Sequence, residues 1–355
     1  MKQKIKKVWS KRPRRKQSPE RSLEQAIKGI PRITNETVAE HREEVLGSAR
    51  KYIYPLQHSA RSVVSISIVL IVVGIITFFT YCFLALYKFN SSSTFLYRVT
   101  QVIPFPIARA GSDFVAYENY LFELRHYMHY YETQQKVDFN STSGQQQLDA
   151  FRKRALDTVV NNAYVKQLAK ENGVSVSDQE VNDQIAIVQS QNRLGNDPKV
   201  FEDVLKEFWG WSLDDFKRVL KQQLLAQKVV SKLDTDTHKR AESALQQVNS
   251  GVNFADVAKQ VSEDKNTAAN GGDYGFAITR TNRDVPAQVV NELFKLQPGQ
   301  TSGIINTGDT LEIVKVNERS GDEVKASHIT FDFKDISEYI KQLSAKEKPK
   351  QYIKP

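Results

Sequence analysis

Two histidines and a run of glycines are the residues whose spacing first suggests chemistry. His126 and His129 lie three positions apart, so a helix would place both on one face, where they could share a metal ion. No third ligand is evident, and a surface helix that carries two histidines explains the pattern. The segment Gly271–Gly275 lacks the Gly-x-x-x-x-Gly-Lys-Ser/Thr pattern of a phosphate loop, so we interpret it as a tight turn that positions the adjoining strand.

Other common catalytic patterns are missing from the sequence. It contains no Gly-x-Ser-x-Gly elbow and no His-Glu-x-x-His motif, which argues against the serine hydrolases and zinc proteases that carry them. Cys82 is the single cysteine, which excludes a scaffold held by disulfides. Six histidines and one cysteine also leave little material for a zinc cage. We therefore do not expect a zinc cage.

The positive charge of the chain is concentrated at one end. The 355 residues include 50 Lys/Arg and 41 Asp/Glu, a net charge of +9. Residues 1–61 hold 16 Lys/Arg and 6 Asp/Glu, a net of +10, so the remaining 34 and 35 leave a net of −1. A basic globular domain that binds nucleic acid is unlikely on this distribution, and we expect no nucleic-acid partner.

An uncharged stretch follows this basic tail. The 26 residues 62–87 carry no charge and are mostly apolar, which is long enough for one transmembrane helix. Basic residues favour the cytoplasmic side of a membrane. We therefore expect a cytoplasmic tail over 1–61 and a single-pass cell-membrane protein whose residues 89–355 are extracytoplasmic.

The remainder divides by its apolar periodicity. Residues 88–110 are polar and proline-broken, which indicates a linker. Apolar residues at three-and-four spacing predict a helical domain over 111–235. Helices then alternate with short strands over 236–332, which predicts an α+β domain with a small antiparallel sheet flanked by helices. A last helix and tail are expected over 333–355.

Three segments of the α+β region resemble parvulin-type peptidyl-prolyl isomerases. They are Phe254 to Asp264, Asn270 to Gly275, and Leu293 to Ser302. The region 153–230 is similar to the helical N-terminal domain of SurA- and PrsA-like foldases. The resemblance implies an enzyme that rotates X–Pro bonds in unfolded or nascent exported polypeptides, without a metal or a cofactor.

The resemblance also implies a site, residue by residue. Asp264 lies where the family places a cysteine or aspartate beside the twisted amide, although a turn residue at a helix end is an equal alternative. Glu312 occupies the place of a family histidine. Tyr274 and Val289 depart from the leucine and phenylalanine that are common there, and with Phe294 they would line or support the proline pocket.

The second family histidine is missing from the start of the domain. The segment Ala326 to Phe331 looks like the strand that normally carries it, but it follows the domain. We hypothesise a permuted sheet, in which a hairpin at 319–322 sets strand 325–332 beside 311–317 and His328 supplies the histidine. The alternative is a second isomerase domain cut short after its first strand.

Two further functional interpretations stay open. The altered site is also consistent with a holdase, a chaperone that binds unfolded clients without isomerising them, and tyrosines between Tyr117 and Tyr131 would then bind the clients. A structural role on one envelope partner is the third possibility.

Overall fold

The computed structural model describes residues 28, 33–53, 56–191 and 197–354. The chain divides into two units, Met1–Thr80 and Tyr81–Pro355. The basic cluster within the first 16 residues lies outside the described residues.

Two helices dominate the first part of the chain, α2 (Asn35–Ile53) and α3 (Leu56–Phe83). The apolar stretch Ser62–Lys88 is 27 residues long, and its most apolar window has a mean hydropathy of 2.8 and no residue buried inside the protein. By length and composition it is able to cross a membrane, as the uncharged stretch predicted. Its last residues form a short π-helix, η1 (Leu84–Lys88).

Residues 88–110, which we expect to be a linker, lie within the second unit and contain the helix α4 (Thr94–Val102). Leu96 and Ile107 are fully buried, and Tyr117 donates a hydrogen bond to the Leu86 carbonyl at 2.7 Å. The polar residues before α4 suggested a loop, but Ser93 among them is the cap of the helix, because its side chain accepts from the Leu96 amide.

The helical part of the second unit contains two long helices and several shorter ones. Serine caps explain two of the starts: Ser177 accepts from the Glu180 amide, and Ser212 forms a reciprocal capping box with Asp215. Gly173 ends α6 with a positive φ of 65°. These elements are α5 (Tyr117–Thr133), α6 (Thr142–Glu171), α7 (Asp178–Gln191), α8 (Pro198–Val204), η2 (Leu205–Trp209) and α9 (Leu213–Leu233).

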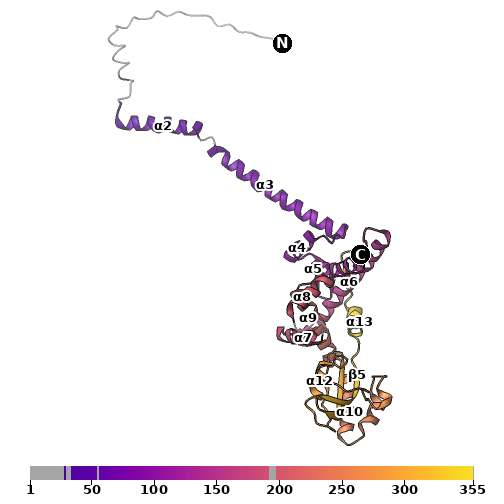
Figure 1. Cartoon of the computed structure of the whole chain (residues 1–355). Coiled ribbons are helices and arrows are strands. Elements are labelled where there is room, and N and C mark those ends of the chain that lie inside the picture. Colours follow the sequence, from indigo (N-terminus) through magenta and orange to yellow (C-terminus); the bar gives the residue numbers. More distant parts are fainter. Residues whose placement is uncertain (1–27, 29–32, 54–55, 192–196, 355) are drawn as a thin grey trace, which may run out of the picture. The chain divides into compact units, whose positions relative to one another are not determined.

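The α+β part follows, and Figure 1 shows it around the labels α10, α12 and β5. Its helices are α10 (Thr235–Asn249), α11 (Phe254–Val261), η3 (Ala268–Asn270) and α12 (Ala287–Leu293). Its antiparallel sheet has the order β3-β4-β5, from β3 (Ile305–Asn306), β4 (Thr310–Ser320) and β5 (Glu323–Asp332). The α+β class predicted from the sequence is confirmed.

The two faces of the β4–β5 ribbon bury different groups, because side chains alternate along a strand. One face, which includes Ile313 and Phe331, packs against α10 and α11. The other begins with an apolar cluster, including Val316 and Val324, that packs against α12. Farther along this second face the side chains become polar, and the candidate site lies there.

The C-terminal segment returns to the helical part. The helix α13 (Ile336–Lys346) contacts α6 and α9. The strand β6 (Lys350–Gln351) then pairs with β1 (Pro106–Ala110), which also pairs with β2 (Asp113–Ala116). A separate second domain does not follow β5 among the described residues, so the last helix closes the fold instead.

Candidate active site

His328 is the centre of the candidate site and comes from β5. In the antiparallel register, His328 lies opposite Val314, and Thr330 lies opposite Glu312. These four residues share one face of the ribbon. The His328 side chain is almost fully buried, with 7 % of the residue exposed.

Asp264 reaches His328 because the segment after α11 is bound along β5. The Glu263 amide donates to the Thr330 carbonyl at 2.8 Å, and the Thr330 amide donates to Ser262 Oγ at 3.1 Å. Asp264 Oδ2 then lies 3.0 Å from His328 Nε2. The backbone pairing of the neighbouring residues therefore brings together two side chains that are 64 positions apart in the sequence.

Glu312 meets the other side of the same ring. Its Oε2 atom lies 3.2 Å from His328 Nδ1, and the Tyr274 hydroxyl donates to that oxygen at 3.2 Å. The Tyr274 ring also stacks on the imidazole, with ring centroids 4.1 Å apart. The three residues that the resemblance assigned to polar roles are thus in direct contact.

The charges of the site are set by burial and by hydrogen bonds. Burial acts to raise the pKa of Asp264, but hydrogen bonds from Thr267 and the Asn266 amide, together with His328, outweigh it and lower that pKa. Burial, and then Glu312, raise the pKa of Tyr274, so its hydroxyl remains a proton donor. An imidazolium donates from both nitrogens, so that form of His328 gives each carboxylate a hydrogen bond.

Gly272 fixes the distance between the glycine turn and β5. The His328 amide donates to the Gly272 carbonyl at 2.8 Å. Gly272 has a φ of +79°, and a Cβ atom there would lie 2.0 Å from the His328 carbonyl oxygen. The turn therefore requires glycine, and it sets Tyr274 over the imidazole ring.

The site opens into a cavity of about 580 Å³. Asp264, Tyr274, Glu312 and His328 all line it. Val289 and Phe294, which were expected to line or support a proline pocket, belong to the adjoining apolar core and are 0 % and 8 % exposed. They support the sheet face, and the apolar wall of the cavity consists of Tyr274 and Pro286.

Sequence reasoning missed two threonines of the site. Thr267 donates to Asp264 Oδ2 at 2.6 Å and lies 2.9 Å from His328 Nε2. Thr330 Oγ1 lies 3.1 Å from His328 Nδ1. The signals were present, because Asp-x-x-Thr is a turn spacing and Thr330 follows His328 by one strand period.

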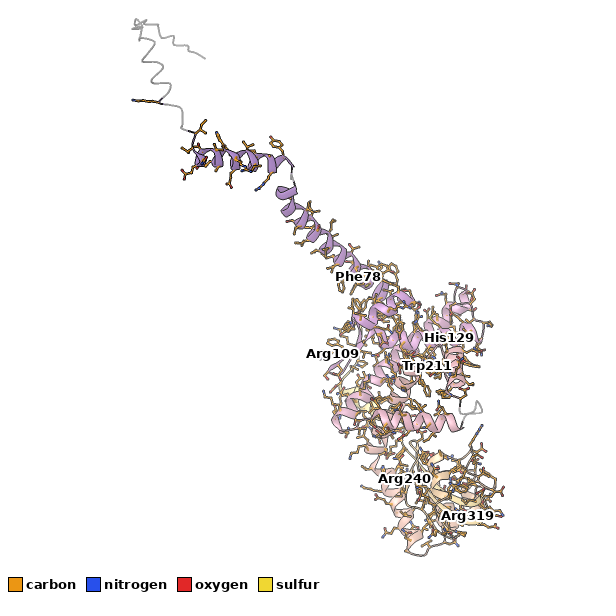
Figure 2. All side chains as sticks on the ribbon, turned by 60° about the vertical axis from the view of Figure 1, so that its left-hand side comes forward. Phe78, Arg109, His129, Trp211, Arg240 and Arg319 are labelled. Carbon is orange, nitrogen blue, oxygen red and sulfur yellow. The ribbon has the colours of Figure 1, made fainter. Side chains whose placement is uncertain are left out.

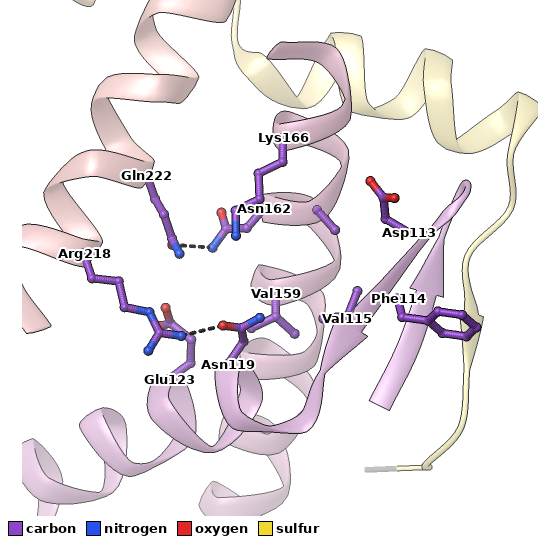
Figure 3. A pocket seen from close by; sticks show the side chains of 11 residues that line it. Asp113, Phe114, Val115, Asn119, Glu123, Val159, Asn162, Lys166, Arg218 and Gln222 are labelled. Carbon is purple, nitrogen blue, oxygen red and sulfur yellow. Dashed lines mark hydrogen bonds between the residues drawn. The ribbon is translucent and has the colours of Figure 1, made fainter. Parts of the chain in front are cut away.

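A second, smaller cavity of about 280 Å³ lies in the helical part (Figure 3). Arg218 of α9 binds both carboxylate oxygens of Glu118, at 2.7 and 2.8 Å, and also donates to Asn119 of α5. Asn162 of α6 donates to Gln222 of α9 at 2.9 Å. These contacts tie three helices together, and none of the residues that the resemblance assigned to the site lies here.

The histidine pair first noted in the sequence has another role. His129 Nε2 lies 2.9 Å from the Glu207 carbonyl, and the His126 ring stacks on Trp211, with ring centroids 4.3 Å apart. Figure 2 labels His129 and Trp211 in this part of the chain. Burial lowers the pKa of His126. Both rings therefore pack α5 against the segment that leads into α9.

Comparison with known protein families supports the two-part architecture. Residues 55–230 match the SurA-like N-terminal domain, and residues 224–318 match the PPIC-type PPIASE domain, described as a rotamase. The resemblance inferred from the sequence is confirmed for both parts. The second match ends before β5, so the place of His328 in the site rests on the geometry.

Individual relatives agree with the family matches. The foldase protein PrsA of Clostridium botulinum strain Langeland is 23 % identical over 257 residues, which cover 62 % of this chain and 74 % of the relative. The chaperone SurA of Burkholderia lata is 42 % identical over 82 residues, which cover 23 % of this chain and 17 % of the relative. A crystal structure of PrsA from Streptococcus pneumoniae aligns with 54 % of this chain and 76 % of its own, at 20 % identity and a TM-score of 0.18.

Proposed function

The chain carries a parvulin-type peptidyl-prolyl isomerase domain behind a SurA-like helical domain, and from this premise we propose a membrane-anchored foldase whose site is built on Asp264, His328 and Glu312. Its substrates are X–Pro bonds in unfolded or nascent exported polypeptides. The single observation that carries this assignment is the hydrogen-bonded row from Asp264 through His328 to Glu312, which opens into a cavity.

Prolyl isomerisation asks little of an enzyme beyond selective binding. Rotation about a peptide bond meets a barrier of about 18–20 kcal/mol, because the planar amide is stabilised by resonance. A site accelerates rotation when it binds the twisted bond more tightly than either planar form. No covalent intermediate is needed.

The polar row suits this task because it is fixed in place before a substrate arrives. The twisted amide regains a lone pair on the proline nitrogen, and a nearby N–H or O–H donor stabilises it. His328 lines the cavity and carries N–H donors, and the two carboxylates orient its imidazole.

The membrane anchor is the segment Ser62–Lys88. In our proposal the basic residues 1–61 remain in the cytoplasm and the SurA-like and parvulin-type domains are outside. A fluorescent protein fused to either end of the chain, with protease protection in intact cells, tests this orientation. Protection of the C-terminal fusion would contradict it.

The catalytic assignment is tested with the full-length chain in detergent, on short blocked X–Pro peptides. Asp264→Asn should lower kcat/KM about tenfold, which corresponds to about 1.4 kcal/mol of transition-state stabilisation. Asp322→Asn, an exposed carboxylate in the β4–β5 hairpin, is the matched control and should retain turnover. If kcat/KM falls equally in both variants, or falls in neither, Asp264 has no catalytic role.

A holdase is the second candidate, and the cavity lining favours it. Tyr274 and Pro286 form a small apolar wall for a proline ring, while Val289 is withdrawn into the core. On the helical part, Phe208 is 39 % exposed beside stacked aromatic rings, including Trp209 and Tyr130. Suppressed aggregation of an unfolded client, with no catalysis of X–Pro exchange by the same preparation, would favour this function over the first.

A further inference from the structure

The cavity beside His328 is strongly acidic. Five carboxylates line it, from Glu263, Asp264, Asp284, Glu312 and Asp332, whereas Lys265 is the one Lys or Arg in its lining. The cavity is therefore a region of negative potential next to the atoms that would contact a proline amide. An isomerase that acted on apolar sequences alone would have no use for this charge.

Three of the five carboxylates already have partners. Asp264 and Glu312 flank His328, at 3.0 and 3.2 Å. Glu263 lies 2.5 Å from the guanidinium of Arg240. The charges of these three carboxylates are therefore already engaged by side chains of the protein.

Asp284 and Asp332 differ from the other three. Both residues are exposed, and no ion pair to either of them is formed within the part of the chain that the structure describes. Burial, and then the charges of Glu263 and Asp264, raise the pKa of Asp332, and the opposing effect of Arg240 offsets them only in part. A cation brought into the cavity would relieve it.

From this charge distribution we infer that the site prefers clients with a lysine or arginine next to the proline. This inference rests on the proposed function, because it places the X–Pro bond at His328. Asp284 and Asp332 bind the cationic side chain at the rim, and the proline occupies the wall formed by Tyr274 and Pro286. The occupant is a cationic peptide rather than a metal ion, since no group of three or more potential metal ligands is clustered among the described residues.

The test compares blocked peptides that differ in one residue. Full-length chain in detergent is assayed on peptides with Lys–Pro, Pro–Lys, Ala–Pro and Glu–Pro, at low and at high salt. We expect kcat/KM for the better lysine peptide to exceed that for Ala–Pro by about tenfold at low salt, as the product of two partly screened charge pairs. High salt should reduce the ratio, and Glu–Pro should be the poorest substrate.

Paired variants locate the effect. Asp284→Asn with Asp332→Asn should reduce the lysine-to-alanine ratio toward one, whereas Glu323→Gln, an exposed acid outside the cavity, should preserve it. Equal turnover of lysine, alanine and glutamate peptides would overturn the charge preference and leave the isomerase assignment standing. If no peptide is turned over, the proposed function fails instead. In that case, binding titrations of the same peptides test the preference for lysine. Equal affinities for the lysine, alanine and glutamate peptides would overturn this preference.

Discussion

At the scale of single residues, the site depends on one histidine held between two carboxylates. Asp264 and Glu312 contact opposite nitrogens of His328, and Thr267 and Thr330 add a hydroxyl on each side. These contacts hold the imidazole ring from both sides. Glu312 also accepts a hydrogen bond from the Tyr274 hydroxyl.

Gly272 gives the first prediction at this scale. Gly272→Ala should destabilise the chain by about 3 kcal/mol, because the new Cβ meets the His328 carbonyl in addition to adopting a positive φ. Turnover of X–Pro peptides should fall with it. Gly275→Ala is the matched control, since Gly275 has a similar φ of +76° and open space around its Cβ position, so it should cost about 1 kcal/mol. Equal unfolding midpoints for the two variants would show that the close approach to the His328 carbonyl does not require glycine.

At the scale of elements, local signals predicted the starts and ends of helices well. The caps at Ser177 and Ser212 and the stop at Gly173 depend on neighbours within a few residues, so the sequence shows them directly. By contrast, whether a residue is buried in a core or lines a pocket depends on partners that are distant in the sequence. Residues 88–110 were therefore missed as ordered structure, and the withdrawal of Val289 from the cavity could not be foreseen from its position alone.

The site itself was predictable only through the resemblance. Composition and spacing gave no reason to connect Asp264 with His328, which lie 64 residues apart. The hairpin between β4 and β5 was inferable because a short turn joins two apolar strands. The roles of Asp264, His328 and Glu312, and the permuted origin of the histidine strand, remain proposals.

Asp234 joins three elements and gives a prediction on pH. It is 1 % exposed and accepts from the Thr237 amide at the start of α10 and from the Lys334 amide after β5. Burial acts to raise its pKa, but these hydrogen bonds prevail and lower it. A lowered folded-state pKa contributes stability above the unfolded value of about 3.9, and this contribution is lost as pH falls through the folded pKa.

Asp234→Asn should therefore cost about 2 kcal/mol of unfolding free energy near neutral pH. The difference from the wild type should shrink as the pH is lowered to about 3, because protonation of Asp234 then weakens the wild type as well. Asp236→Asn, an exposed carboxylate two residues away, controls for general charge effects. A difference that stays constant with pH would show that the Asp234 charge has no such role.

At the scale of the whole molecule, the C-terminal segment connects the two folded parts. It leaves the isomerase domain at β5, contacts α6 and α9 through α13, and ends with β6 beside β1. Ile353 is 4 % exposed, and the Tyr164 hydroxyl donates to the Glu347 carbonyl. The strand that carries His328 is thus continuous with the segment that completes the helical part.

Removal of residues 336–355 should destabilise the helical part. Trp209 and Trp211 report on it selectively, because the third tryptophan is Trp9 and the isomerase domain contains none. We expect the thermal midpoint of tryptophan fluorescence to fall by about 5 °C or more, since buried area at α6 and α9 is lost. Tyr164→Phe, which removes only the bond to Glu347, should shift it less. An unchanged midpoint in the truncated chain would contradict this role.

We propose that His328, from a strand after the matched domain, completes an isomerase site. Exchange NMR on a short X–Pro peptide measures cis–trans interconversion directly, with full-length wild type and with His328→Ala in detergent. We expect catalysed exchange by the wild type, about tenfold slower exchange in His328→Ala, and unchanged exchange in the control His238→Ala, which lies outside the cavity. Equal exchange rates for wild type and a folded His328→Ala chain would contradict it.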